Sequence, residues 1–133
     1  MTYLLDTNSI SLLMREDVQI AAWLSSVRDD DRVVTCTIAR GEILFGVKRL
    51  AQGRRRSELE AKAQELFAAL PCEAIPSGAG DFYADIKIAR QSRGLALDEN
   101  DLWIAATALA VGATLVSRDI DFMGIETLAV IAP

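Results

Sequence analysis

The opening stretch Met1–Asn8 constrains this chain most strongly. Its apolar run Tyr3-Leu4-Leu5 predicts a buried strand that begins almost at the first residue. The strand ends at the carboxylate of Asp6, and the three residues that follow are types that favour a helix N-terminus. A strand running directly into a helix is typical of α/β sheets, in which ligands bind beyond the carboxyl ends of the strands. Asp6 is therefore a candidate site residue, with helix capping as an equally weighted alternative.

Strand and helix patterns alternate along the rest of the chain. Short apolar runs predict further strands near residues 33–36, 72–75, 113–117 and 128–131. Between them, apolar residues recur at helical spacing over residues 18–27, 38–51, 57–70 and 81–93, and again from Asp98 onward. This alternation predicts a three-layer α/β fold, with a mainly parallel five-stranded sheet flanked by helices. A chain of 133 residues fits one domain, spanning residues 1–133.

Local signals set expectations for the helix ends and faces. Thr37 is a candidate N-cap for the helix over Ile38–Ala51, and Ser57 is expected to begin the next helix. In the helix over Asp81–Arg93, the residues expected to face inward are Phe82, Ile86 and Ala89, with Tyr83 as a further candidate.

The composition limits the chemistry that this chain can perform. Histidine is absent, which removes histidine general bases, Ser-His and Cys-His nucleophile pairs and His-rich zinc sites. The net charge of −5 argues against a generally basic, nucleic-acid-coating surface, but not against a nuclease whose acids surround metal ions. No secretion signal is visible, and the longest uncharged stretch, Leu102–Ser117, is short and polar for a membrane span. We therefore expect a cytoplasmic protein with no membrane partner.

Two acids occupy unusual positions on predicted helices. Glu42 has no basic residue three or four positions away, and its neighbours there are apolar or small, so a cation is its natural partner. Asp101 stands at the third position of a helix that Asp98 is expected to cap. It could simply complement the helix dipole, yet its own stripe neighbours are apolar. We favour a functional role for both acids.

Two further acids, Asp119 and Asp121, follow the predicted strand over residues 113–117. Ser117 is the last residue expected in the strand, so Asp119 lies roughly 6–7 Å of extended chain beyond it. Asp119 is therefore expected near the edge where Asp6 emerges. Asp121 is further along and is expected to cap the turn that buries Phe122.

These positions can converge on one edge of a parallel sheet. Four ionised carboxylates at close range would repel one another unless a counter-charge is present. Hard divalent cations such as Mg²⁺ or Mn²⁺ prefer oxygen ligands and would relieve that repulsion. Such a site supports metal-assisted phosphodiester cleavage without histidine. The candidate metal-binding and catalytic residues are Asp6, Glu42, Asp101 and Asp119, with Asn8, Ser117 and Asp121 as candidates for supporting roles.

Four motifs in order along nearly the whole chain resemble the PIN-domain family, and more narrowly its VapC-type toxins. The motifs are Leu4–Asn8, Arg40–Gly46, Asn100–Ala108 and Leu115–Asp119. The resemblance implies a Mg²⁺- or Mn²⁺-dependent endoribonuclease acting on RNA, the toxin of a type II toxin–antitoxin system. It further implies a homodimer, inhibited by a cognate VapB-type antitoxin. Ser117 stands where the family often has threonine, and Asp98-Glu99 adds acids where it often has smaller residues.

Two expectations about alternatives and partners remain. The rival function is a non-catalytic, receiver-like regulatory module that binds Mg²⁺ at strand-end acids, although the chain lacks the expected arrangement of a central phosphoacceptor Asp and a late-strand Lys. For the antitoxin, the apolar stripes over Ile43–Leu50 and Leu59–Leu70 are expected to form a groove for a partner helix, rimmed by Lys48, Arg49 and Arg54–Arg56.

Overall fold

A single parallel sheet organises the structure, a computed structural model that describes residues 1–133. Its strands lie in the order β3 (Cys72–Glu73), β2 (Arg32–Cys36), β1 (Thr2–Leu5), β4 (Thr114–Val116) and β5 (Val130–Ile131). Every neighbouring pair is parallel, and β1 pairs with β2 on one side and with β4 on the other. The expected five-stranded parallel sheet is therefore confirmed.

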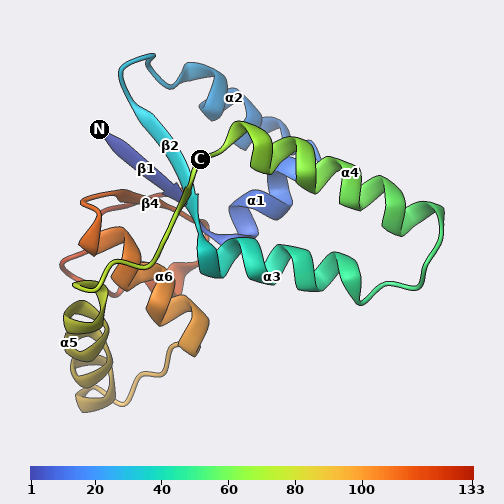
Figure 1. Ribbon diagram of the computed structural model, residues 1–133. Coiled ribbons are helices and arrows are strands. Elements are labelled where there is room, and N and C mark those ends of the chain that lie inside the picture. The colour runs from blue at the N-terminus through green and yellow to red at the C-terminus, as the bar shows by residue number, and fades with distance from the viewer.

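The helices cover both faces of this sheet, as Figure 1 shows. They are α1 (Thr7–Met14), α2 (Val18–Ser26), α3 (Thr37–Lys48), α4 (Arg54–Ala69), α5 (Ala79–Ser92), α6 (Glu99–Ala110) and α7 (Ile120–Met123). The chain moves from β1 outward to β3 through α1–α4, then returns across the sheet to β4 through α5 and α6. Because parallel crossovers are right-handed, this reversal places the two groups of helices on opposite faces. The result is the three-layer α/β architecture expected from the sequence.

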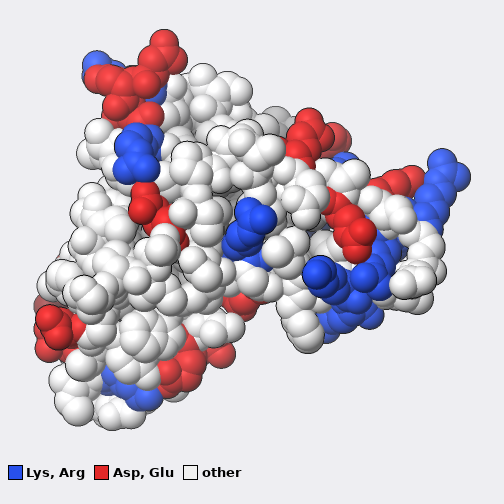
Figure 2. Space-filling view, viewed as in Figure 1, with Lys and Arg blue, Asp and Glu red and all other residues white.

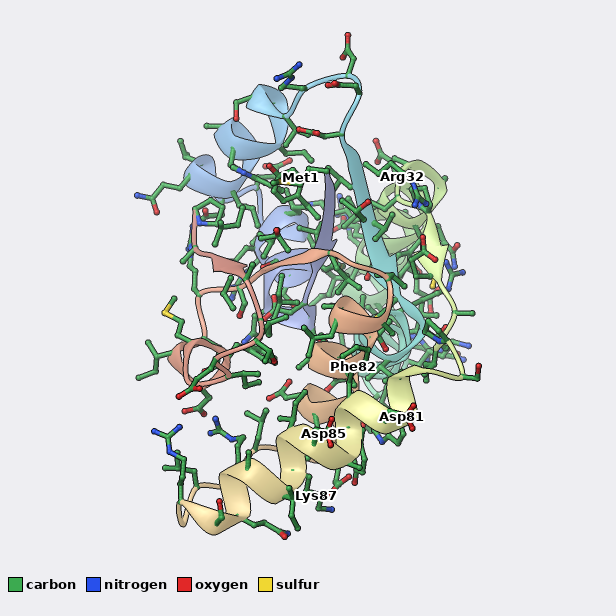
Figure 3. The ribbon with its side chains drawn as sticks, turned by 90° about the vertical axis from the view of Figure 1, so that its left-hand side faces the viewer. Met1, Arg32, Asp81, Phe82, Asp85 and Lys87 are labelled. Atoms are coloured by element: carbon green, nitrogen blue, oxygen red, sulfur yellow. The ribbon has the colours of Figure 1, made fainter.

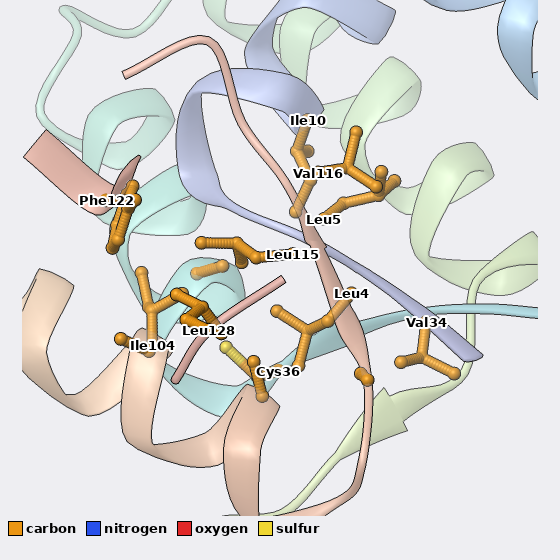
Figure 4. Packing of buried hydrophobic residues seen from close by; sticks show 14 of the residues in the cluster. Leu4, Leu5, Ile10, Val34, Cys36, Ile104, Leu115, Val116, Phe122 and Leu128 are labelled. Carbon is orange, nitrogen blue, oxygen red and sulfur yellow. The ribbon is translucent and has the colours of Figure 1, made fainter. Parts of the chain in front are cut away.

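The core lies where β1 and β4 meet the helices on either side. Leu4 and Leu5 of β1, and Leu115 and Val116 of β4, are completely buried. Figure 4 shows these side chains among residues from both layers, including Ile10 and Ile104. Strands that are covered on both faces need apolar residues at every position, which explains the continuous apolar runs in the sequence.

Several helix ends differ from their predicted positions. Thr37 is the first residue of α3 and not its cap, because β2 runs into the helix without a spacer and Cys36 takes the cap position. Helix α3 ends at Lys48, before the expected Ala51. Helix α4 begins at Arg54, three residues before Ser57, and its first turn is supported by ion pairs with the glutamates four residues on.

Helix α5 presents to the core a face that matches the predicted one only in part. Its buried residues are Ala79, Ile86 and Arg90, whereas Phe82 and Ala89 are exposed. The buried stripe includes Ile86, as predicted, but it also carries the charged residue Arg90, which apolar periodicity does not select. None of the helices has the length and apolar character needed to cross a membrane.

Candidate active site at the carboxyl edge of the sheet

Asp6 stands at the end of β1, in the crevice where the order of the strands reverses. Its side chain is only 2% exposed, and one carboxylate oxygen accepts a hydrogen bond of 2.8 Å from the backbone N–H of Ser9. Asp6 is thus the N-cap of α1 as well as a candidate site residue, so both readings from the sequence describe the same side chain. Ligands of open α/β sheets bind at this kind of switch point, here between β1 and β4.

Two serines join the ends of β1 and β4 around Asp6. The buried Ser9 hydroxyl donates to the carbonyl oxygen of Val116 at 2.7 Å, and Asp6 donates its own N–H to the same oxygen at 3.3 Å. Ser117 is fully buried, hydrogen-bonds to Asp6 and accepts the backbone N–H of Asp119 at 3.0 Å. The hydroxyl at position 117 therefore connects two of the candidate acids.

Asp119 is the N-cap of α7, a short helix that the sequence analysis expected only as a turn. One oxygen of its carboxylate accepts the backbone N–H of Asp121 at 2.9 Å. The expectation that Asp121 caps this turn is therefore wrong: the side chain of Asp121 is exposed, and Asp119 provides the cap. Phe122 is buried as expected, with 1% exposure.

Arg118 anchors the chain just beyond the end of β4. Its guanidinium forms an ion pair of 2.7 Å with Asp17, the N-cap of α2, and donates to the carbonyl oxygen of Pro133 at 2.8 Å. The hydrogen bond from Arg118, followed by that from the Ile20 amide, lowers the pKa of Asp17 below its usual value. The backbone that carries Asp119 is thereby tied to α2 and to the chain end.

Glu42 comes from the second turn of α3 and is half-buried. Its carboxylate accepts a hydrogen bond of 2.7 Å from the Thr7 hydroxyl, which projects from the first residue of α1. The sequence pattern marks Thr7 only as a capping residue type and does not predict this contact. Beside Glu42 lies a hollow of about 480 Å³, lined by Thr37, Ile38, Gly41, Glu42, Phe45 and Asn100.

Asp101 sits in the first turn of α6, whose expected N-cap, Asp98, is confirmed by its hydrogen bond from the Asn100 amide. Its surroundings raise its pKa from 3.8 to about 6. Burial is the largest cause, followed by the negative charges of Asp98, Glu42, Asp119 and Asp6. The structure therefore brings Asp101 within electrostatic range of the other three candidate acids.

Asp6 responds to its environment in the same direction. Burial raises its pKa, and the charge of Asp119 adds to the effect, while hydrogen bonds from Ser117 and Ser9 oppose it. Buried carboxylates that repel one another are typical of functional sites, because a folded protein gains no stability from such an arrangement without a counter-charge.

The extra acids at the start of α6 have separate roles. Glu99 is paired with Lys87 and accepts a hydrogen bond from the Tyr83 hydroxyl, and these contacts lower its pKa. Asp98 remains part of the field around Asp101. The extra acids at the start of α6 therefore add one negative charge, that of Asp98, near the candidate site. Asn8, a candidate for a supporting role, is exposed at the start of α1.

The four acids supply only carboxylate oxygens, the ligand type that hard divalent cations prefer. As the side chains stand, no three acidic or thiol groups surround a common point closely enough to hold a metal ion. Mutual repulsion favours separated rotamers, and a cation would favour converging ones. The chemistry of the donor set therefore fits a divalent cation, with side-chain rotation needed to complete the site.

Comparisons with known proteins agree with this architecture. The family model described as PIN domain matches residues 3–127. Ribonuclease VapC1 of Haemophilus influenzae (strain R2866) is 32% identical over 124 residues, covering 90% of this chain and 88% of the relative. Toxin FitB of Neisseria gonorrhoeae (strain FA 1090) is 32% identical over 138 aligned positions, covering 98% and 96% of the two chains.

Solved structures give the same result at the level of the fold. FitAcB from Neisseria gonorrhoeae is 29% identical, with a TM-score of 0.79 and coverage of 97% of this chain and 96% of that one. VapBC2 from Rickettsia felis, bound to a DNA fragment from its promoter, superposes with a TM-score of 0.91 over 100% of this chain and 99% of that one. At 22% identity, this second likeness supports the fold alone. With a family match over nearly its whole length, the chain belongs to the PIN-domain family, among its VapC-type members.

Proposed function

We propose that this protein is a divalent-metal-dependent endoribonuclease, the toxin of a type II toxin–antitoxin pair. The observation that carries the proposal is the meeting of four acids from separate segments at the switch point between β1 and β4. The names of the relatives, Ribonuclease VapC1 and Toxin FitB, support the activity and the toxin role. Membership of the PIN-domain family does not support the receiver-like alternative.

We assign the metal-holding role to Asp6, Glu42, Asp101 and Asp119, and Mg²⁺ or Mn²⁺ as the ion. A bound ion of this kind supplies Lewis acidity and a more acidic water for phosphodiester hydrolysis. The chain's own contribution is to hold these carboxylates in place. Asp6 accepts a hydrogen bond from the Ser9 amide and Glu42 accepts one from the Thr7 hydroxyl, which limits the conformational freedom that each carboxylate loses when the ion binds.

The test is cleavage of single-stranded RNA by homogeneous protein, first in EDTA and then with Mg²⁺ or Mn²⁺ restored. Cleavage should depend on the added ion, and Asp6→Asn should lower it by about 100-fold or more while circular dichroism stays unchanged. Full activity in excess EDTA would refute the proposal. A parallel assay with a small phosphodonor would reveal phosphorylation, the outcome expected of the receiver-like alternative.

For the partner, we propose a VapB-type antitoxin that lays a helix against α1 and α4. The stripes on α3 and α4 do not form the expected groove, because Ile43 and Val47 of α3 and Ala63 and Phe67 of α4 are buried. A hollow of about 300 Å³ lies instead between α1 and α4, and it is lined by Leu13, Met14, Glu16, Lys62, Glu65, Leu66 and Ala69. Leu13→Asp should weaken antitoxin binding in a pull-down while RNA cleavage is retained.

The basic residues of the hairpin formed by α3 and α4 are less free to contact an antitoxin than expected. Figure 2 shows Lys and Arg side chains over the outer end of the α3–α4 hairpin. Arg54 and Arg56 are already paired with Glu58 and Glu60. We therefore assign the antitoxin contact to the hollow between α1 and α4.

We also propose a homodimer that uses the outer side of α5 and α7. Ile88 is 67% exposed and Ile120 is 77% exposed, which leaves large apolar side chains in solvent on both helices. Ile88→Asp should convert the dimer to a monomer in light scattering. A monomeric wild-type protein would refute the assignment.

A further inference from the structure

Arg90 is a buried cation that the proposed chemistry has not yet used. It lies near the C-terminal end of α5 and is only 7% exposed. Figure 3 views the molecule from the side of this helix. One guanidinium nitrogen donates to the carbonyl oxygen of Asp121 and the other to that of Ala96, both at 3.3 Å. The Nε atom has no hydrogen-bond partner.

This arginine has no acidic partner, since none of the ion pairs in the structure includes Arg90. Burying a cation without an anion, and leaving one of its N–H groups unpaired, is unfavourable for folding. An apolar side chain of similar length would fill the same space without that penalty. The stability of the core therefore does not account for Arg90.

The two carbonyl groups that Arg90 binds belong to the segments that carry Asp119 and Asp101. Asp121 follows Asp119 by two residues within α7, and Ala96 precedes the α6 cap, Asp98, by two residues. The guanidinium thus joins two separate segments by one hydrogen bond to each.

Packing at the end of α7 supports the same arrangement. A Cβ atom added at Gly124 would lie 3.2 Å from a guanidinium nitrogen of Arg90, so glycine lets the chain pass close to the charge. The planar guanidinium presents donors in fixed directions, which suits two acceptors on different segments better than the single ammonium group of lysine.

We infer that Arg90 is a positioning residue that sets the distance between the Asp119 turn and the N-terminal turn of α6. The inference rests on the proposed metal-dependent function. Arg90 touches neither the acids nor RNA; it fixes the two backbone segments from which Asp119 and Asp101 reach the ion. Loss of this link leaves the fold intact and weakens metal binding.

The experiment compares wild type with Arg90→Met, which keeps length and packing, and with Arg90→Lys, which keeps the charge but not the fork. Arg93→Met is the matched control, because Arg93 lies one turn away, is exposed and makes no ion pair. Thermal unfolding is followed in EDTA and then in an Mn²⁺ titration, and RNA cleavage is measured across the same titration.

Arg90→Met should unfold in EDTA at the wild-type temperature or above it, while the Mn²⁺ concentration for half-maximal stabilisation and for half-maximal cleavage rises about 10-fold or more. Arg90→Lys should require similarly raised Mn²⁺, and Arg93→Met should match wild type in every assay. An unchanged Mn²⁺ midpoint in Arg90→Met overturns the inference, as does a loss of metal-free stability that parallels the loss of metal response. If wild type itself neither binds Mn²⁺ nor cleaves RNA, the proposed function fails. That result is distinct from the one that overturns this inference, in which wild type and Arg90→Met are both active and have equal Mn²⁺ midpoints.

Discussion

Replacing Asp101 by asparagine should make the metal-free protein more stable near neutral pH. The folded protein holds the pKa of Asp101 at about 6, against 3.8 for the free group. Between these values the folded state binds the proton more tightly than the unfolded state, so stability falls as pH rises through this window. Near pH 7 the carboxylate is ionised, and its repulsion by the other acids is fully present.

The size of the effect follows from the same two pKa values. For a fully buried group, their difference corresponds to about 3 kcal/mol in the free energy of unfolding. Because Asp101 is only half-buried, solvent screening reduces the gain in unfolding free energy on mutation to about 1 kcal/mol. For a chain of 133 residues, this change raises the unfolding temperature by about 3–4 °C.

The assay is thermal unfolding in EDTA from about pH 4 to pH 7, with Asp85→Asn as the control for loss of one surface charge. Asp101→Asn should have a higher unfolding temperature than wild type near pH 7, and the difference should shrink towards pH 4, where Asp101 is protonated in the folded state and about half protonated in the unfolded state. Addition of Mn²⁺ should reverse the order, because only wild type keeps the full set of ligands. A pH-independent difference, or a less stable Asp101→Asn protein near pH 7, would refute the reasoning.

Three further predictions address the shell around the site. Thr7→Val removes the donor to the α3 carboxylate and should raise the Mn²⁺ requirement about 10-fold, measured by cleavage across a metal titration. Asp119→Asn should raise that requirement, whereas Asp121→Asn should leave it nearly unchanged; the opposite pattern would assign the fourth carboxylate to Asp121. Asp17→Asn breaks the ion pair with Arg118, and because the folded pKa of Asp17 is lowered, its unfolding temperature should fall near pH 7. That difference should shrink as the pH is lowered through and below 3.8, the free value for Asp17, and an equal loss at every pH would exclude the ion pair as its cause.

The sequence predicted the sheet well because β1 and β4 are continuous apolar runs, each followed directly by polar residues. It also predicted which acids would approach one another, since strand-end positions of a parallel sheet meet at one edge. The hydrogen bond from Thr7 to Glu42 joins residues 35 positions apart, and no local pattern encodes it. That these acids bind a metal ion remains a prediction.

Arg90 shows why the remaining contacts could not be predicted. Apolar periodicity in α5 selected Phe82 and Ala89, because a charged residue does not contribute to a hydrophobic stripe. Its inward position follows from carbonyl groups on two distant segments that become available only in the folded chain. The short helix α7 was missed for a related reason, since four residues contain too little periodicity to detect.

The position of β1 in the middle of the sheet has a consequence for biosynthesis. The first strand to be made pairs on one side with β4, which is separated from it by more than a hundred residues. Such non-local parallel pairing is slow to form, because a long loop must close before any contact is gained. Asp119, the last of the four candidate acids along the sequence, can join Asp6 only after residues 1–119 have been synthesised. A chain that has been made only as far as α6 therefore lacks one of the four acids proposed to hold the metal ion.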